Sequence, residues 1–112
     1  MTIEPWADAR LSEALPLLAQ GGESETVEFK RELPKQVRDL AKEIAAFASS
    51  SGGQLILGVA DDGSIPGVAN ADDPAVRDDL ERRIVGVCQI IDPPVRPSIS
   101  WASADGGGVL VV

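Results

Sequence analysis

Residues 35–59, KQVRDLAKEIAAFASSSGGQLILGV, decide the fold of this chain. Apolar side chains recur in the first half at the i, i+3, i+4 and i+7 spacing of an amphipathic helix, at Val37, Leu40, Ala41, Ile44, Phe47 and Ala48. Gly52-Gly53 provides a helix stop. Residues 54–60 are almost wholly apolar, which is typical of a strand buried on both faces. The run therefore predicts a helix over residues 35–50 that leads into a central strand.

The residues before this helix predict a strand and a broken helix. Val27 and Phe29 alternate with Glu28 and Lys30, and this period of two indicates a half-buried strand. Residues 7–20 look helical but contain Pro16, which removes a helical hydrogen bond and clashes with the preceding turn. We therefore expect two short helical pieces here, with the second one beginning at the proline.

The residues after the central strand predict a hairpin, a helix and two strands. Residues 61–64, DDGS, form a turn signal, and residues 65–68 would be a short returning strand. Asp73 followed by Pro74 predicts a helix start, and the run DPP at residues 92–94 ends that helix. We expect strands over residues 95–103 and 109–112, with a glycine loop at residues 106–108 between them.

This order of elements predicts an α+β fold with two layers, in which helices pack on a mixed β-sheet. The length of 112 residues suits one domain with a modest core. The last four residues are apolar and the chain then stops, so we expect a fragment of a longer protein with further C-terminal domains.

Composition excludes several classes of protein. No apolar run approaches the ~20 residues needed to span a bilayer, and no secretory signal is visible, so we expect a cytoplasmic location without membrane contact. Cys88 is the single cysteine and histidine is absent. The usual zinc ligand sets and every histidine-based catalytic triad are therefore excluded.

The charge is unevenly distributed along the chain. The net charge is −8, which argues against non-specific affinity for nucleic acid. A local basic segment nevertheless stands out, and its members are Lys30, Arg31, Lys35, Arg38 and Lys42. These side chains could bind phosphates, or they could form an ordinary solvated face. No aromatic side chains interleave with them, so base stacking is not indicated.

Glu23 and Glu28 are candidate catalytic residues, because paired carboxylates can hold Mg²⁺ or Mn²⁺ for phosphodiester cleavage. Five residues of continuous strand would separate them by about 17 Å and point them to opposite faces. They could share a metal only if the chain turned near residues 24–26. Spacing alone favours two solvated glutamates over a metal site.

The glycines predict structure rather than phosphate binding. The pattern of a P-loop is absent from the sequence. The double glycine also follows a helix and precedes a strand, which reverses the order that cradles a phosphate. We therefore expect turns, a helix cap and close packing at five structural glycines, namely Gly52, Gly53, Gly58, Gly63 and Gly67.

Several of these motifs, in this order, resemble one known family. ESETVEFK at residues 23–30 is followed by a helix ending in AFA, the double glycine, an apolar strand ending in GV, then DDG and a second GV at residues 67–68. The set resembles the Schlafen/AlbA-like DNA-binding domain family, formerly called the divergent AAA domain. The likeness covers about residues 21–112 and leaves residues 1–20 as a helical lead-in. It implies an α+β fold and nucleic-acid binding in bacterial proteins described as transcriptional regulators.

The resemblance also bears on catalysis. Some Schlafen proteins are ribonucleases whose metal site resembles a Glu-x-x-x-x-Glu-Phe-Lys element plus an aspartate just before the double glycine. Glu23 and Glu28 match the first two positions, whereas Ser51 takes the third and cannot replace a carboxylate on a hard divalent ion. The older AAA label would imply ATP binding, which the missing P-loop does not support.

The leading interpretation is therefore a non-catalytic nucleic-acid-binding module of a bacterial regulator, which prefers DNA to RNA and needs no cofactor. A metal-dependent ribonuclease of Schlafen type, using Mg²⁺ or Mn²⁺, is the first alternative. A protein-interaction or dimerisation module, with a homodimer as one form, is the second, and the acidic net charge favours it.

Overall fold

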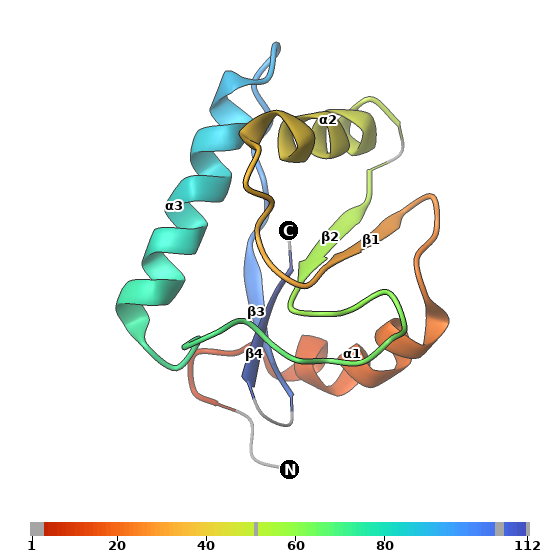
Figure 1. Cartoon of the computed structure of the whole chain (residues 1–112), viewed down its shortest axis with the longest axis vertical. Helices are drawn as coiled ribbons and strands as arrows, with labels where there is room; N and C mark the ends of the chain where they lie inside the picture. Colours follow the sequence, from red (N-terminus) through yellow and green to blue (C-terminus); the bar gives the residue numbers. More distant parts are fainter. Residues whose placement is uncertain (1–3, 51, 105–106, 112) are drawn as a thin grey trace.

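The computed structural model describes residues 4–50, 52–104 and 107–111 and places a four-stranded mixed sheet at the centre of the molecule. The elements follow one another as α1 (Ala9–Gly21), β1 (Val27–Lys30), α2 (Val37–Ala48), β2 (Gln54–Leu57), α3 (Pro74–Ile90), β3 (Ser100–Ala104) and β4 (Gly107–Val111). The strand order is β1-β2-β4-β3 (Figure 1). β1 pairs with β2 in parallel, and the other two pairings are antiparallel. The predicted α+β fold with a mixed sheet is confirmed.

The β2 strand is central, as its apolar sequence predicts, and it contributes to two cores. Leu55 and Leu57 point to the face covered by α2 and α3. Ile56 points to the opposite face, where it packs in one cluster with Leu15 and Ala19 of α1. The alternation of side chains along a strand explains this division. Helices therefore cover both faces, and α1 adds a third layer to the two that were expected.

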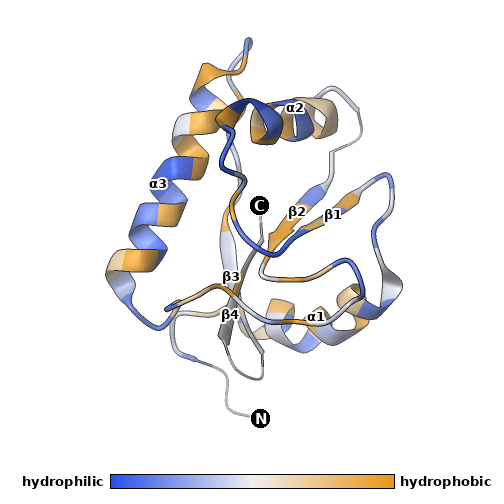
Figure 2. Cartoon of the chain, in the orientation of Figure 1, coloured by the Kyte–Doolittle hydropathy of each residue, from blue (hydrophilic) through white to orange (hydrophobic). Residues whose placement is uncertain are grey.

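Figure 2 shows the corresponding distribution of hydropathy: β2 is mostly hydrophobic, while α2 and α3 alternate between hydrophobic and hydrophilic residues. In α2 the buried side chains are Leu40 and Ile44, one turn apart. In α3 they are Ile84, Val87 and Cys88. The helical spacing in the sequence therefore identifies the sides of α2 and α3 that face the sheet.

The prediction of two helical pieces before residue 21 is wrong, because α1 continues through Pro16. The Asp8 side chain caps the helix by accepting a hydrogen bond from the backbone N–H of Leu11 at 2.8 Å. The Ser12 hydroxyl accepts a hydrogen bond from the backbone N–H of Ser103 in β3 at 2.8 Å. Leu15 is fully buried on the sheet. Ala19, after the proline, is buried as well, so packing on both sides of Pro16 outweighs the helical hydrogen bond that it removes.

The two other helices lie close to their predicted positions. α2 begins at Val37 and ends at Ala48, slightly inside the predicted range. α3 begins at Pro74, and the Asp73 side chain caps it by accepting from the backbone N–H of Ala75 at 2.9 Å. The N-cap prediction for α3 is therefore confirmed.

The predicted strand over residues 65–68 does not form. A turn does occur at residues 61–64, where Asp62 accepts a hydrogen bond from the backbone N–H of Ser64 at 2.9 Å. The chain then bends at Gly67, whose N–H donates to the carbonyl of Gly58 at 2.9 Å. Only an isolated bridge links Val68 to Gly108. The turn at residues 61–64 is therefore predicted correctly, but the hairpin that should follow it does not form.

The boundaries of the last two strands also differ from the prediction. β3 begins at Ser100 instead of residue 95, because Pro97 has no N–H to give to a ladder. Gly107 and Gly108 belong to β4 instead of a loop, while Gly106 lies outside the described residues. A side chain at Gly108 would lie 2.6 Å from the Trp6 ring. This glycine thus allows Trp6 to pack directly on the strand.

Across residues 4–50, 52–104 and 107–111, no helix is both long enough and apolar enough to cross a membrane.

Candidate nucleic-acid interface

The chain turns between Glu23 and β1, which brings Glu23 back beside the strand. Ser24 and Val27 exchange backbone hydrogen bonds of 2.9 and 3.4 Å across this turn. A Glu23 carboxylate oxygen, Oε2, then accepts a hydrogen bond from the backbone N–H of Phe29 at 2.9 Å. β1 is an edge strand, so Glu23 satisfies an N–H that no strand would otherwise pair. The chain therefore makes the turn without which Glu23 and Glu28 could not lie close together.

Lys30 is the centre of a cluster of carboxylates. Its Nζ lies 2.8 Å from Oε1 of Glu43 on α2 and 3.6 Å from Oε1 of Glu28 on its own strand. The three side chains are about two-thirds buried. We call Glu23, Glu28, Lys30 and Glu43 the acid–lysine cluster. It joins β1 to α2 through an ion pair.

The environment shifts the pKa values of two members of this cluster. Burial raises the pKa of Glu28, the negative charges of Glu23 and Glu43 raise it further, and Lys30 opposes them. The hydrogen bond with Glu43 is the largest influence on Lys30 and raises its pKa, although burial acts in the opposite direction. Lys30 is therefore held in its charged form, and Glu28 is the member whose ionisation is disfavoured.

The donor set of this cluster does not fit a divalent metal ion. Oε2 of Glu23 already accepts from Phe29, and the Lys30 ammonium lies between the carboxylates of Glu28 and Glu43. Within the part of the chain that the structure describes, no three His, Cys, Asp or Glu side chains are placed to hold a metal ion. Ser51, at the third position of the Schlafen pattern, lies outside the described residues.

The remaining cations of the basic segment have a different environment from Lys30. We call them the basic surface, and they are Arg31, Lys35, Arg38 and Lys42. All four are exposed. Arg31 and Lys35 lie in the connection after β1, and the other two lie on α2 at i, i+4 spacing. Among the described residues none of the four forms an ion pair, so their charges face solvent.

The sequence analysis missed two contributors to this region. Glu43 was not singled out in the sequence, since nothing in the helix spacing connects it with Lys30. Arg83 of α3 lines a groove of about 500 Å³ together with Lys35. Arg83 also pairs with Asp79 through an Nε–Oδ2 distance of 3.0 Å. The Lys30–Glu43 pair and the groove shared by Lys35 and Arg83 join residues that are distant in the sequence, so only the fold reveals them.

The structural glycines lie at turns and close approaches. Four of the five have positive φ, namely Gly52, Gly58, Gly63 and Gly67. At Gly58 a side chain would also lie 3.1 Å from the backbone of Gly67. The fifth, Gly53, packs against the ring of Phe47. Turn geometry and packing thus account for these residues without a bound phosphate.

Comparison with known proteins identifies one family. The family model described as Schlafen, AlbA_2 matches residues 23–112 of the chain. No curated protein matches the chain. The match includes the whole sheet, the acid–lysine cluster and the basic surface, whereas α1 precedes it.

Proposed function

The chain belongs to the Schlafen AlbA_2 family, whose members are associated in general with nucleic acids, and on this premise we propose that it is a nucleic-acid-binding module. Its phosphate contacts would come from the basic surface. Lys30 would instead serve to hold β1 against α2, because two carboxylates already occupy its ammonium group. DNA is the partner we expect, within a bacterial transcriptional regulator.

The exposure of the basic surface is the observation that carries this proposal. Its four cations lie within one short stretch, and none of them forms an ion pair among the described residues. Lysine and arginine side chains of this kind neutralise phosphates and release counterions from the strand. With a net charge of −8, the rest of the chain repels a polyanion. Binding must therefore be local and sensitive to the exact position of these four residues.

A pair of matched triple variants tests the proposal. The first, Lys35→Ala/Arg38→Ala/Lys42→Ala, removes three cations of the basic surface. The second, Arg10→Ala/Arg82→Ala/Arg96→Ala, removes three exposed cations elsewhere and changes the net charge equally. Fluorescence anisotropy with short DNA duplexes, single strands and structured RNA at low salt measures the affinity of each protein.

We expect the first variant to bind at least about tenfold more weakly than the wild type. Each phosphate contact that is lost leaves its counterion on the strand, so the favourable release of that counterion no longer contributes to binding. The second variant should bind like the wild type. Equal losses in the two variants would show that net charge alone matters and would contradict the assignment. Tighter binding of RNA than of DNA would contradict the expected partner.

The ribonuclease alternative has one observation in its favour, which is the return of Glu23 to the same strand as Glu28. We nevertheless propose that the acid–lysine cluster is an ion-pair network, because each of its three carboxylates already has a partner through one oxygen, although Oε2 of Glu43 is buried without one. Incubation of labelled RNA with the protein and Mg²⁺ or Mn²⁺ tests this choice. We expect no cleavage above that of the Glu28→Gln variant. Cleavage that depends on metal and disappears in Glu28→Gln would favour the enzyme.

A further inference from the structure

A pocket of about 360 Å³ opens between α3, the connection after β1 and the segment that follows Gly67. Its volume lies within the range of about 300–1,000 Å³ typical of ligand sites. Buried Leu57 of β2 contributes to its lining. The other apolar lining residues come from three separate segments and include Leu33, Val68, Val76 and Leu80.

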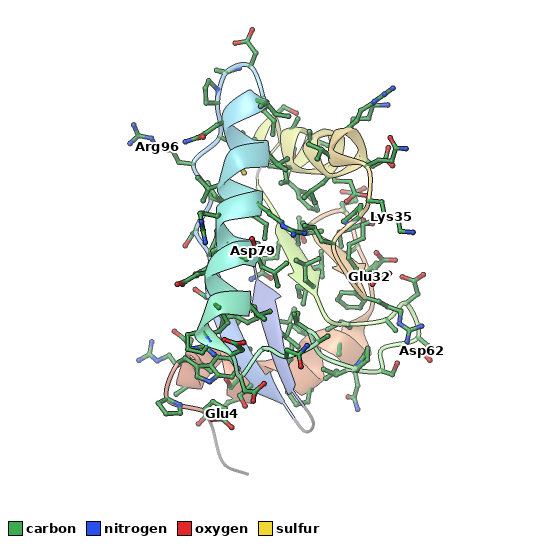
Figure 3. All side chains as sticks on the ribbon, turned by 60° about the vertical axis from the view of Figure 1, so that its left-hand side comes forward. Glu4, Glu32, Lys35, Asp62, Asp79 and Arg96 are labelled. Carbon is green, nitrogen blue, oxygen red and sulfur yellow. The ribbon has the colours of Figure 1, made fainter. Side chains whose placement is uncertain are left out.

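Three charged and exposed residues complete this pocket, namely Arg31, Glu32 and Asp79. Figure 3 shows Asp79 on α3 and Glu32 on the connection that follows β1. Arg31 belongs to the pocket and also to the basic surface. A nucleic-acid strand bound at the basic surface would therefore pass beside the pocket.

We propose that this pocket receives one unpaired base of a bound strand while Arg31 contacts an adjacent phosphate. The proposal rests on the proposed function and adds a subsite to it. Bases that leave a stack are commonly held between apolar as well as aromatic side chains. Aliphatic walls from α3 and from the 31–33 segment could fulfil this role, although the basic segment itself contains no interleaved aromatic residue.

Asp79 gives the pocket a preference among bases. Its Oδ2 lies 3.0 Å from Nε of Arg83, which restrains the carboxylate. An ionised carboxylate accepts hydrogen bonds and cannot donate them. It can pair with the amino group of cytosine, whereas the carbonyl at the same position of uracil would be repelled. The pocket therefore favours a base that carries an exocyclic amino group.

Filling the pocket tests the base subsite. Ala69→Leu/Ala75→Leu adds bulk at two exposed lining positions, and Ala9→Leu/Ala14→Leu adds the same bulk at exposed positions of α1. Each protein is titrated with a single-stranded cytosine octamer and with an abasic octamer of the same length. We expect the pocket variant to bind the cytosine strand roughly tenfold more weakly, because it no longer buries a base against apolar side chains, and the abasic strand unchanged. The α1 variant should match the wild type on both strands.

Replacing the carboxylate tests the base preference. We expect wild type to bind a deoxycytidine octamer about three- to tenfold more tightly than a deoxyuridine octamer, as one charge-assisted hydrogen bond allows. Asp79→Ala should abolish this difference. A preference that survives in Asp79→Ala would overturn the role of the carboxylate.

The outcomes separate this inference from the proposed function. If the pocket variant loses affinity for both strands equally, or for neither, the base subsite is wrong while phosphate binding stands. If wild type binds a DNA duplex but neither octamer at low salt, the subsite is wrong while the proposed function stands. If it binds no nucleic acid at low salt, both fail.

Discussion

At the scale of single residues, Lys30 shows how the same side chain can be predicted for one role and used for another. It belongs to a basic run in the sequence, but its ammonium lies 2.8 Å from Glu43 and contacts Glu28 as well. Its removal would leave two carboxylates, each about two-thirds buried, without their cation. The free energy of unfolding lost in this way exceeds the small contribution of an exposed ion pair.

The first prediction concerns this ion pair. We expect Lys30→Gln to lower the free energy of unfolding by about 1–3 kcal/mol at pH 7, because the partly buried acids lose a charged hydrogen bond. Because the pKa of Lys30 is raised in the folded state, this stabilisation is fully present at pH 7, which lies below the pKa of lysine in the unfolded chain. It is lost as the pH rises through the pKa of Lys30 in the folded protein. Urea denaturation measures the change. Lys42→Gln, at an exposed position, is the control and should change stability by less than about 0.5 kcal/mol. Equal effects of the two substitutions would contradict the pairing.

The second prediction concerns the pH dependence contributed by Glu28. Its pKa is raised in the folded state, so the folded protein binds more protons than the unfolded one between the unfolded and folded pKa values. Ionised Glu28 therefore costs stability above this window, and the cost disappears as the pH falls below about 4.5, the ordinary value of the carboxyl. We expect Glu28→Gln to raise the free energy of unfolding at pH 7 by roughly 0.5 kcal/mol, a value kept small by solvent screening. Denaturation at pH 7 and pH 4 measures it, and a loss of stability at pH 7 would contradict the sign.

At the scale of elements, α1 forms one face of the core although the family match begins after it. Leu15 and Leu17 lie two residues apart on α1 but have opposite environments. Leu15 is fully buried, whereas Leu17 is 75% exposed. We expect Leu15→Ala to lower the free energy of unfolding by about 2–4 kcal/mol through lost burial and a cavity. Leu17→Ala should change it by less than about 0.5 kcal/mol. Denaturant titration compares the two, and a mild effect of Leu15→Ala would mean that α1 is dispensable.

How far sequence predicts an element depends on where its stabilising contacts lie. The caps, spacing and apolar runs of α2, β2 and α3 are local, and these elements are predicted well. The continuity of α1 through Pro16 depends on Ser103 and the sheet, which are distant in sequence. The missing strand at residues 65–68 has the same origin, because its distant contacts are one hydrogen bond from Gly67 to Gly58 and one isolated bridge from Val68 to Gly108 of β4 instead of a continuous ladder.

The candidate site follows the same rule. The basic surface is one continuous stretch and is therefore visible in the sequence. The Lys30–Glu43 pair and the pocket bring together β1, α2 and α3, so neither could be read from spacing. The condition set for Glu23 and Glu28, a turn at residues 24–26, is met, yet the structure uses Glu23 to satisfy the edge of the sheet.

At the scale of the whole molecule, a net charge of −8 and an exposed basic surface act in opposite directions on a polyanion. Screening by salt weakens both, but counterion release from the strand depends only on the phosphates that are contacted. Salt dependence therefore separates local contacts from the general repulsion.

The slope of log binding constant against log salt concentration tests the central claim most directly, for the wild type and for Lys35→Ala/Arg38→Ala/Lys42→Ala. We predict a steep negative slope for the wild type and a slope shallower by roughly 2–3 for the variant, because three phosphate contacts are lost. Identical slopes for the two proteins, or no binding by the wild type at low salt, would contradict the account.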